Sequence, residues 1–507
     1  MNESTAQAIA LIIYFVAMIM IGLWAYQRTD DLDDYMLAGR NLPPAVAALS
    51  AGASDMSGWL LMGLPGAIYA TGLVEFWIAV GLTIGAYLNW VFVAPRLRTY
   101  TEVSSNSITV PSFLDNRLRD TTHLLRIVSG IIIFIFFTFY VSSGMVAGGK
   151  FFDSSFGMEY HLGMVLVAGI VVLYTLIGGF LAVSWTDLVQ ACMMVTALVM
   201  IPIVAIIEFD GGAGDLFRTA HAANPAIYSV LAGTTALAVI SNLAWGLGYF
   251  GQPHIIVRFM ALRTAHDAKA GRRIGIGWMI FSVVGTALVA VVGLGYFSGA
   301  GRELADPETV FIAMGKVLFH PVISGFLLAA VLAAIMSTIS SQLLVTSSAL
   351  VEDIYKVFSK SGRTLTEKRM VLYGRVAVLV VAVLAALLAW NPDSTILDLV
   401  GFAWAGFGAS FGPIILLALY WRRLTNYGAL AGMIVGSLTV GIWGRFLSGG
   451  PGSIFDLYEI LPGFLFALLV AVLVSKATYT HDDGIQAEFD EAVRLSKVGK
   501  QDDAHAV

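Results

Sequence analysis

Charged residues are scarce in this chain of 507 residues. Asp, Glu, Lys and Arg make up 12% of it and hydrophobic residues 58%, whereas soluble domains carry about 25% charged residues. The mean hydropathy is correspondingly high, at +0.81. So little charge excludes an ordinary soluble domain and predicts an all-α polytopic membrane protein.

Cysteine is almost absent, which removes two further classes of structure. Cys192 is the one cysteine and lies in an apolar stretch, where we expect a small buried side chain. A disulfide framework and a cysteine metal site are therefore excluded. Residues 2–7 lack the basic region of a secretory signal, so no cleavable leader is expected. No nucleophile with a matching base stands out either, so we expect a protein that is not an enzyme.

Long apolar runs are abundant, and they predict thirteen membrane spans. The expected spans are residues 8–26, 43–70, 76–95, 126–149, 162–179, 188–208, 231–257, 274–298, 321–350, 371–390, 395–420, 427–447 and 459–475. With the N-terminus outside, 24 of the 29 Lys and Arg residues fall in inward segments and 5 in outward ones. This asymmetry predicts an N-out, C-in orientation. The tail is expected to be cytoplasmic, partly helical and solvated.

The second span is polar at its centre. Residues 50–59 read SAGASDMSGW and include a carboxylate, Asp55. A charge at mid-membrane costs about 2.5–3.5 kcal/mol on insertion scales, and glycine and serine weaken a helix. The stretch predicts a helix broken at mid-membrane, a device by which transporters hold ions and small charged solutes. The alternative is a bent helix in which Asp55 is a structural polar group paired with a neighbouring helix.

The seventh span is interrupted as well. Residues 245–254 read WGLGYFGQPH, and three glycines and a proline within eight residues break any helix. Interruptions in spans two and seven, five helices apart, favour an inverted repeat of five plus five helices. The predicted units are residues 1–42 (first span and inner loop), 43–208 and 231–420 (the two repeats), 427–475 (spans twelve and thirteen) and 476–507 (tail).

The ninth span offers oxygen atoms. Residues 332–342 read LAAIMSTISSQ, and these small, hydroxylated side chains suit either close helix packing or a hard monovalent cation. Neither this stretch nor residues 50–59 contains the His or Cys that a transition metal would prefer. Three aromatic residues with polar tips, Tyr140, Trp245 and Tyr249, could face lipid or offer their rings to a solute that carries an ammonium group.

Four passages together resemble the sodium:solute symporter family. They are residues 49–65 (LSAGASDMSGWLLMGLP), 174–190 (YTLIGGFLAVSWTDLVQ), 245–260 (WGLGYFGQPHIIVRFM) and 332–345 (LAAIMSTISSQLLV). A further family signature is matched by Arg423, Gly428, Ala429 and Gly432. The resemblance covers nearly the whole chain, and its first and third passages are similar to the proline-transporting branch. Ser341 stands where related members carry a cysteine.

The resemblance implies the leucine-transporter type of fold, with inverted repeats in spans two to six and seven to eleven. It implies Na⁺-coupled symport of L-proline into the cell across a bacterial cytoplasmic (inner) membrane, by alternating access. The partners would be L-proline, sodium ions and membrane lipid, with no nucleic acid and no obligatory protein partner. Two alternatives stay open. One is a related symporter, coupled to Na⁺ or H⁺, for pantothenate, a sugar or a short acid; the other is a solute sensor on the same fold.

The resemblance also implies roles for residues at matching positions. For sodium it implies the carbonyls of Ala53, Met56 and Ala334, the hydroxyls of Ser337 and Thr338, and Asp55 as the acid behind sodium dependence. For proline it implies Ser57, Gly58, Tyr140, Trp245, Tyr249 and Pro253. The positions linked to coupling on the inner side are Arg40 and Asp187. We expect Asp187 in a short inward loop after Gly178 and Gly179, where capping a helix is its alternative role.

Overall fold

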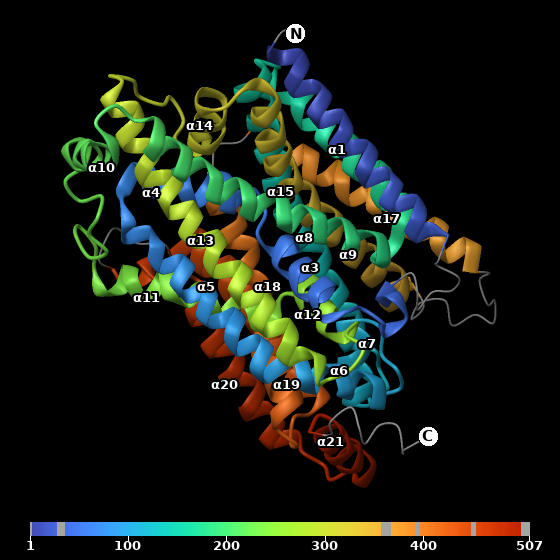
Figure 1. Ribbon diagram of the computed structural model, residues 1–507. Coiled ribbons are helices and arrows are strands. Elements are labelled where there is room, and N and C mark those ends of the chain that lie inside the picture. Colours follow the sequence, from blue (N-terminus) through green and yellow to red (C-terminus); the bar gives the residue numbers. More distant parts are fainter. Residues whose placement is uncertain (1–2, 28–35, 356–366, 392–394, 448–452, 498–507) are drawn as a thin grey trace.

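The computed structural model of the protein describes residues 3–27, 36–355, 367–391, 395–447 and 453–497. These ranges are helical almost throughout, and within them β pairing is limited to an isolated bridge between Leu42 and Leu262. The expected all-α architecture is therefore confirmed. Figure 1 shows the long helices packed against one another. The end of the predicted tail, residues 498–507, lies outside the described ranges.

The helices of the first half are α1 (Glu3–Tyr26), α3 (Pro44–Asp55), α4 (Leu64–Thr71), α5 (Phe76–Leu88), α6 (Ala94–Val103), α7 (Val110–Arg117), α8 (Leu124–Phe156) and α9 (Tyr160–Glu208). Those of the second half are α10 (Gly212–Ala223), α11 (Ala236–Ala244), α12 (Pro253–Met260), α13 (Asp267–Gly299), α14 (Val310–Leu318), α15 (Pro321–Ser348), α17 (Glu367–Leu388), α18 (Ile396–Tyr420), α19 (Asn426–Ile442), α20 (Ile460–Thr478) and α21 (Asp483–Leu495). Short 3₁₀ or π segments complete them: η1 (Ala38–Arg40), η2 (Trp59–Gly63), η3 (Leu73–Glu75), η4 (Asn89–Val93), η5 (Trp245–Gly251), η6 (Pro307–Thr309), η7 (Ala349–Tyr355), η8 (Trp443–Leu447) and η9 (Ile454–Asp456).

Many of these helices have the length and composition of membrane spans. Within the described ranges, nine are long and apolar enough to cross a bilayer, and four shorter apolar helices accompany them. Large apolar side chains such as Ile12, Phe281 and Leu387 are exposed on their outer faces. Cys192 is exposed as well, so the expectation of a small buried side chain there is wrong. A soluble monomer rarely exposes apolar patches on this scale, so lipid is the medium that suits this surface. The protein is a multi-pass membrane protein.

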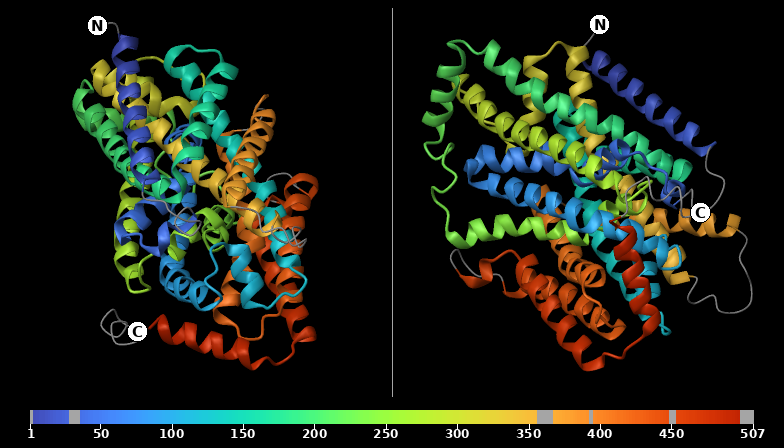
Figure 2. Two further views of the ribbon diagram at one scale, coloured as in Figure 1. Left: turned by 90° about the vertical axis from the view of Figure 1, so that its right-hand side faces the viewer. Right: turned by 60° about the horizontal axis from the view of Figure 1, so that its bottom comes forward.

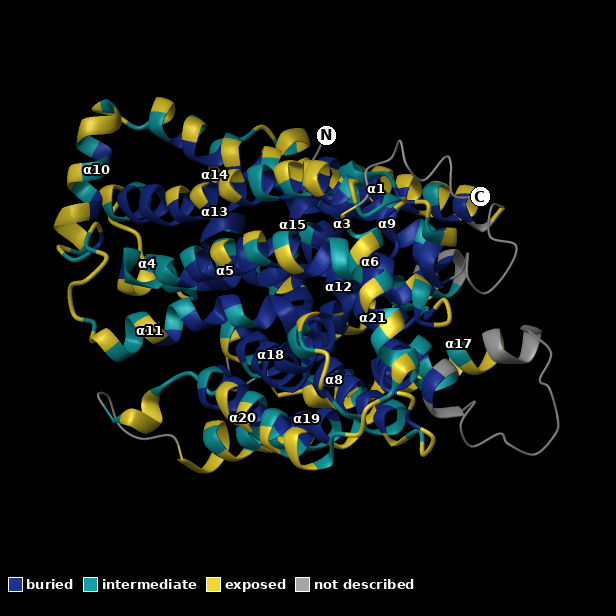
Figure 3. Ribbon diagram, turned by 90° about the horizontal axis from the view of Figure 1, so that it is seen from below, coloured by how far each residue is buried: buried dark blue, intermediate teal, exposed yellow. Residues whose placement is uncertain are grey.

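Burial separates a central group of helices from a peripheral one. In α15 and α18, 83% of the most apolar stretch of 18 residues is buried inside the protein, compared with 28% in α1 and 22% in α19 with its extension η8. Figure 3 shows this contrast, with dark buried ribbon in the middle and exposed residues on the outer helices. Functional side chains on α15 and α18 therefore face other helices, whereas those on α1 and α19 largely face lipid.

The chain turns at Gly179 without a loop. Gly179 has φ 59° and ψ −167°, which interrupts α9 and starts a second helical part at the next residue. Glycine adopts such a positive φ readily because it lacks a Cβ atom. The expectation of a short inward loop around Asp187 is therefore wrong, because the turn is completed at Gly179. Asp187 lies inside the second part of α9 and is fully buried.

Both predicted interruptions are present. The first break comprises residues 56–63: α3 ends at Asp55, Met56 has a non-helical ψ of 76°, and the π-helical η2 leads into α4. The second break comprises residues 245–252, where the 3₁₀ segment η5 and an extended Gln252 separate α11 from α12. Two helices thus stop and restart in the protein interior.

The tail contains a docked helix. α21 lies against α6 at the bottom of the molecule, where the left-hand view of Figure 2 shows it below the other helices. Phe489 of α21 is buried, and its ring lies edge-on to Tyr100 at 6.1 Å. Arg119 forms ion pairs with Asp482 at 3.1 Å and with Glu488 at 3.3 Å. The tail is partly helical as predicted, but its Phe489 face is packed rather than solvated, because this face of α21 is apolar.

Candidate functional site

The first break leaves backbone oxygens that neighbouring side chains reach. The Asp55 carbonyl accepts the Ser57 amide at 2.9 Å and the Trp59 indole N–H at 3.1 Å. The Tyr140 hydroxyl from α8 lies 3.4 Å from the same carbonyl. The end of α3 is therefore held by groups from the break itself and from α8, instead of by a continuing helix.

Oxygen atoms from α3 and α15 converge beside this break. Ser337 Oγ lies 2.8 Å from the Ala53 carbonyl and 3.1 Å from the Ala334 carbonyl. Thr338 Oγ1 lies 3.4 Å and 3.3 Å from the same two carbonyls. Each of the two hydroxyls thus lies within hydrogen-bonding distance of both carbonyls, which brings together four of the five residues predicted to supply sodium ligands. Met56, the fifth, lies at the break itself.

The chemistry of this cluster suits a hard monovalent cation. The atoms that could act as metal ligands are two hydroxyl and two carbonyl oxygens, all of them uncharged. Among the residues that the structure describes, no group of three or more His, Cys, Asp or Glu side chains could hold a metal ion. Oxygen ligands without thiolate or imidazole do not favour a transition metal.

Asp55 connects the first break to the second. It is 1% exposed, and its Oδ2 atom accepts a hydrogen bond from the Tyr249 hydroxyl of η5. Its Oδ1 atom is buried without a hydrogen-bond partner in the protein. An unpartnered buried carboxylate oxygen is costly, so a site that retains one has unused capacity to hold a donor or a cation. Asp55 is also paired with another segment through Tyr249, so the alternative of a structural Asp55 stays open beside a role in holding a cation.

The residues predicted to hold a solute do not form one cluster. Ser57 and Gly58 lie in the first break, and Tyr140 and Tyr249 both reach Asp55. Trp245 lies at the start of η5, where its ring stacks on Tyr458 at 5.1 Å and 22°. All are buried, so of the two alternatives for the three aromatics, the one in which they face lipid is wrong. 

Pro253 lies apart from these residues. It starts α12 and lines a separate small pocket between α7, α9, α12 and α15. Thr109, Phe180 and Leu344 are among the other residues that line it. A proline at the first position of a helix is also favourable for purely structural reasons.

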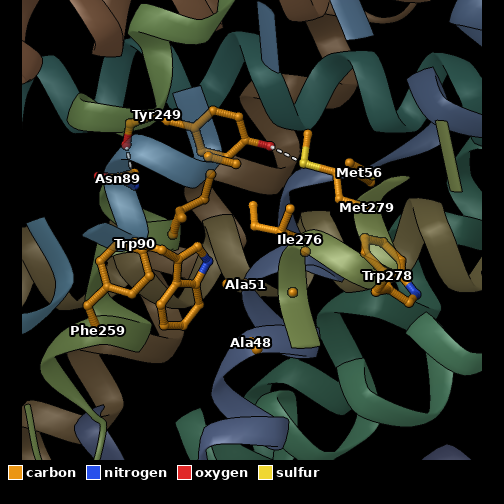
Figure 4. A pocket seen from close by; sticks show the side chains of 14 residues that line it. Ala48, Ala51, Met56, Asn89, Trp90, Tyr249, Phe259, Ile276, Trp278 and Met279 are labelled. Atoms are coloured by element: carbon orange, nitrogen blue, oxygen red, sulfur yellow. Dashed lines mark hydrogen bonds between the residues drawn. The ribbon is translucent and has the colours of Figure 1, made fainter. Parts of the chain in front are cut away.

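A small apolar pocket adjoins the two breaks. Met56 of the first break and Tyr249 of the second line it, together with Trp90, Phe259 and Trp278. Figure 4 shows the Tyr249 ring at its edge, with the hydroxyl directed toward the Met279 sulfur, 4.0 Å away. Asn89 Nδ2 donates a hydrogen bond to the Tyr249 carbonyl at 2.9 Å. No sequence pattern had indicated a role for Asn89.

Asp187 belongs to a buried ion network that joins four helices. Its Oδ2 atom accepts from Arg258 of α12 at 3.1 Å and from Ser50 of α3 at 2.7 Å. Arg258 also donates to Ser50 at 3.0 Å and to Ser341 of α15 at 2.6 Å. Sequence analysis did not single out Arg258. Arg258 directly follows the predicted span 231–257, so it counted among the inward-side charges rather than as an arginine within a span, which would have been a functional candidate.

Arg40 forms several hydrogen bonds near the end of α12. Its guanidinium donates to Asn106 at 2.9 Å, to Thr101 at 2.9 Å, to the Ser107 carbonyl at 2.7 Å and to the Met260 carbonyl at 3.0 Å. These partners lie at the ends of α6 and α12 and in the loop that follows α6. Arg40 therefore ties α12, which follows the second break, to α6 and the loop after it, but it does not reach either break itself.

Comparisons with known proteins give the chain relatives along almost all of its length. The sequence model described as "Sodium:solute symporter family" matches residues 35–436. A high-affinity proline transporter, PutP, of Bacillus subtilis (strain 168) is 56% identical, over 94% of this chain and 98% of the relative. The osmoregulated proline transporter OpuE of the same strain is 55% identical, over 93% and 94%. A sodium/proline symporter of Staphylococcus aureus (strain JH9) is 51% identical, over 93% and 92%.

Two solved structures share the fold at low sequence identity. One is a Na⁺-coupled sialic acid symporter in a substrate-bound outward-open state, with a TM-score of 0.79 and 18% identity over 95% of this chain and 100% of the other. The other is Mhp1, a nucleobase-cation-symport-1 family transporter in a closed conformation, with a TM-score of 0.55 and 14% identity over 91% and 100%. With the family match over most of its length and relatives above 50% identity, the chain belongs to the sodium:solute symporter family.

Proposed function

We propose that this protein is a secondary active symporter that couples the entry of L-proline to the entry of Na⁺ by alternating access. One observation carries the proposal: the Ser337 hydroxyl of α15 lies 2.8 Å from the Ala53 carbonyl beside the first break. A cation held there joins α3 to α15. Relatives at 51–56% identity are named proline transporters or sodium/proline symporters, which supports proline as the solute and sodium as the coupling ion.

The proposed topology has thirteen spans, with the N-terminus outside and the C-terminus in the cytoplasm. Nine long apolar helices and four shorter ones support this number, and the excess of Lys and Arg in the inward segments supports the orientation. Residues 43–208 and 231–420 form the two inverted repeats. Residues 1–42 precede them, residues 427–475 add two spans, and residues 476–507 form the tail. The membrane is the bacterial cytoplasmic membrane.

In the proposed ion site, sodium is held by the carbonyls of Ala53, Met56 and Ala334 and the hydroxyls of Ser337 and Thr338. The hydroxyl–carbonyl hydrogen bonds between α3 and α15 give way to contacts with the ion, which fixes the first break against α15. Asp55 adds a negative charge next to this shell and raises its affinity for a cation. Because Asp55 also accepts from Tyr249, the ion stabilises the second break in the same step.

In the proposed solute site, proline binds between the two breaks. Ser57 and Gly58 border it, and Tyr140, Trp245 and Tyr249 offer aromatic faces to the pyrrolidine ring and its ammonium. The carboxylate meets free amides at a broken helix end, where the dipole favours negative charge. Pro253 acts by starting α12 directly after the second break. Arg40 and Asp187 act in coupling, because both tie α12 to other helices at points away from the solute.

Uptake into proteoliposomes tests this function. Purified protein should accumulate radiolabelled L-proline under an inward Na⁺ gradient and should not do so with equal Na⁺ on both sides. Under equal Na⁺, an inside-negative potential set with valinomycin should speed uptake, since moving one net charge is worth about 2.3 kcal/mol per 100 mV. Accumulation driven by a proton gradient alone would assign a different coupling ion. Binding of proline without accumulation would assign a sensor.

A further inference from the structure

The second break is an unusual segment that needs support from outside itself. Its 3₁₀ part, η5, runs for seven residues. Runs of 3₁₀ helix longer than three or four residues are uncommon because their hydrogen-bond geometry is poor. Trp245 and Tyr249, two of the proposed solute residues, stand on this segment. Whatever holds η5 in shape therefore also sets where those two rings lie.

Trp404 of α18 contacts the second break at both of its ends. Its indole N–H donates to the Trp245 carbonyl at 2.7 Å. Its own carbonyl accepts from the Gln252 side chain at 3.0 Å. Both residues are buried, Trp404 at 1% exposure and Gln252 at 0%, so water does not compete for these bonds.

The Trp404 ring also meets the middle of the break. It lies edge-on to the Tyr249 ring, with centroids 5.1 Å apart and an interplanar angle of 84°. Gly248 allows this approach, because a Cβ atom there would come within 1.9 Å of Trp404 Nε1. The hydroxyl of Tyr249 in turn donates to Asp55. Trp404 thus supports the start, middle and end of the segment from one position.

We propose that Trp404 is a positioning residue for the solute site: it holds η5 so that Trp245 and Tyr249 face the solute. The inference rests on the proposed function and adds to it a residue on a helix that carries none of the predicted site residues. Trp404 acts through the backbone and rings of η5 rather than through contact with proline. Its loss therefore weakens proline binding more than sodium binding, because the oxygen cluster lies on α3 and α15.

The test compares two tryptophans that make the same kind of bond. Trp404→Phe keeps an aromatic ring but removes the N–H that reaches the Trp245 carbonyl. The matched control is Trp443→Phe, which removes an indole N–H bond of 3.0 Å to the Leu457 carbonyl, away from both breaks. The measurements are proline half-saturation in proteoliposomes and radiolabelled sodium binding without proline, each normalised to folded protein by size-exclusion chromatography.

Trp404→Phe should raise the proline half-saturation concentration by about two- to tenfold, the effect of losing one net hydrogen bond. Its half-saturation concentration for sodium should change by less than about twofold, because the oxygen cluster lies on α3 and α15 and not on η5. Trp443→Phe should change neither. Equal effects of the two substitutions, or a Trp404→Phe effect confined to the sodium constant, would overturn the inference.

A second variant covers the case in which Trp404→Phe does not fold. Gln252→Met removes the bond to the Trp404 carbonyl and leaves the indole in place. It also replaces Gln252 Oε1, which is buried without a partner, so little stability is at risk. This variant should also raise the proline constant, and an unchanged constant would overturn the inference. Failure of the wild-type protein to take up proline would instead overturn the proposed function, and the inference with it.

Discussion

The two breaks use the same device, but different neighbours support them. Hydroxyls of Ser337 and Thr338 reach the helix that leads into the first break. The second extends over η5 and is supported by an indole, an amide and stacked rings, as at Trp404 and Trp245. A broken helix by itself offers only backbone groups. The side chains that surround each break decide whether it suits a cation or an organic solute.

The two breaks also share features that limit this contrast. Tyr249 of the second break donates to Asp55, which ends the helix before the first. Below them, Arg258 of α12 and Ser50 of α3 belong to one buried ion network. A substitution in one break is therefore expected to change ligand binding at the other as well, by an amount that depends on the strength of these hydrogen bonds.

Breaking the ion network should have the largest effect, because it joins α3, the helix before the first break, to α12, the helix after the second. Arg258→Met leaves Asp187 buried without its counter-ion. The loss of one partner of a buried ion pair lowers the free energy of unfolding by about 3–5 kcal/mol. Thermal unfolding of the purified protein should show the loss. The double variant Arg258→Met/Asp187→Leu should recover much of it, and Arg273→Met, the same change at an exposed position, should cost little. Wild-type stability in the Arg258→Met variant would mean that the network does not hold the helices together.

Asp55→Asn should mainly affect the cation side. The change keeps the shape of the side chain but removes the charge next to the oxygen cluster. Charged hydrogen-bonding groups contribute about 1.5–3 kcal/mol, so the sodium concentration for half-maximal uptake should rise by about tenfold or more. Tyr249→Phe is the matched variant: it keeps the charge, removes the hydroxyl, and should shift the proline constant as well. Unchanged sodium dependence in Asp55→Asn would make Asp55 a structural residue.

Substitutions of the side chains at each break should affect the half-saturation concentrations for sodium and for proline separately. Ser337→Ala and Thr338→Ala should chiefly raise the sodium constant, because alanine offers no oxygen. Trp245→Ala should chiefly raise the proline constant, by about 1–2 kcal/mol or tenfold, since it removes an aromatic face. Both constants are measured for each purified variant, normalised to protein in the liposomes. If the two hydroxyl variants change only the proline constant, the sodium site has been assigned to the wrong helix.

The tail helix should affect neither break. Arg119→Ala removes two exposed ion pairs to α21, and such pairs contribute little. Limited proteolysis should show slightly faster cleavage of α21, with both transport constants unchanged. Arg494→Ala is the control, because Arg494 pairs with Glu491 inside the same helix. A change in either constant in Arg119→Ala would assign the tail a part in transport.

The docking of α21 should also weaken in acid. Asp482 caps the helix by accepting the Ile485 amide at 2.9 Å, and this bond, with Arg119 nearby, lowers the pKa of Asp482 below its usual value. A carboxyl whose pKa is lowered in the folded state stabilises that state above its unfolded pKa. The contribution is lost as the pH falls through the lowered pKa. Cleavage of α21 should therefore rise only under strongly acidic conditions, and Asp482→Asn should remove that dependence.

Much of the site was predictable because its signals are local. Asp55 with its glycines and serines, the glycines around Tyr249, and the hydroxyls near Ser337 each mark a short stretch that cannot behave as an ordinary span. Asp187 was misplaced because a single glycine, Gly179, turned the chain where a loop was expected. The tail was misjudged because the apolar side of α21 finds a partner in Tyr100, which no local pattern indicates.

By itself, the sequence determined that the protein is helical and membrane-embedded, where two helices break, and which stretch carries hydroxyl oxygens. These properties follow from composition and from residues a few positions apart. The tertiary structure alone decided what supports each break: Trp404 lies 159 positions from Trp245, and Arg258 lies 71 from Asp187. The physical reason is that a buried donor or charge must find its partner in space. Which partner it finds depends on how helices distant in the chain are packed together.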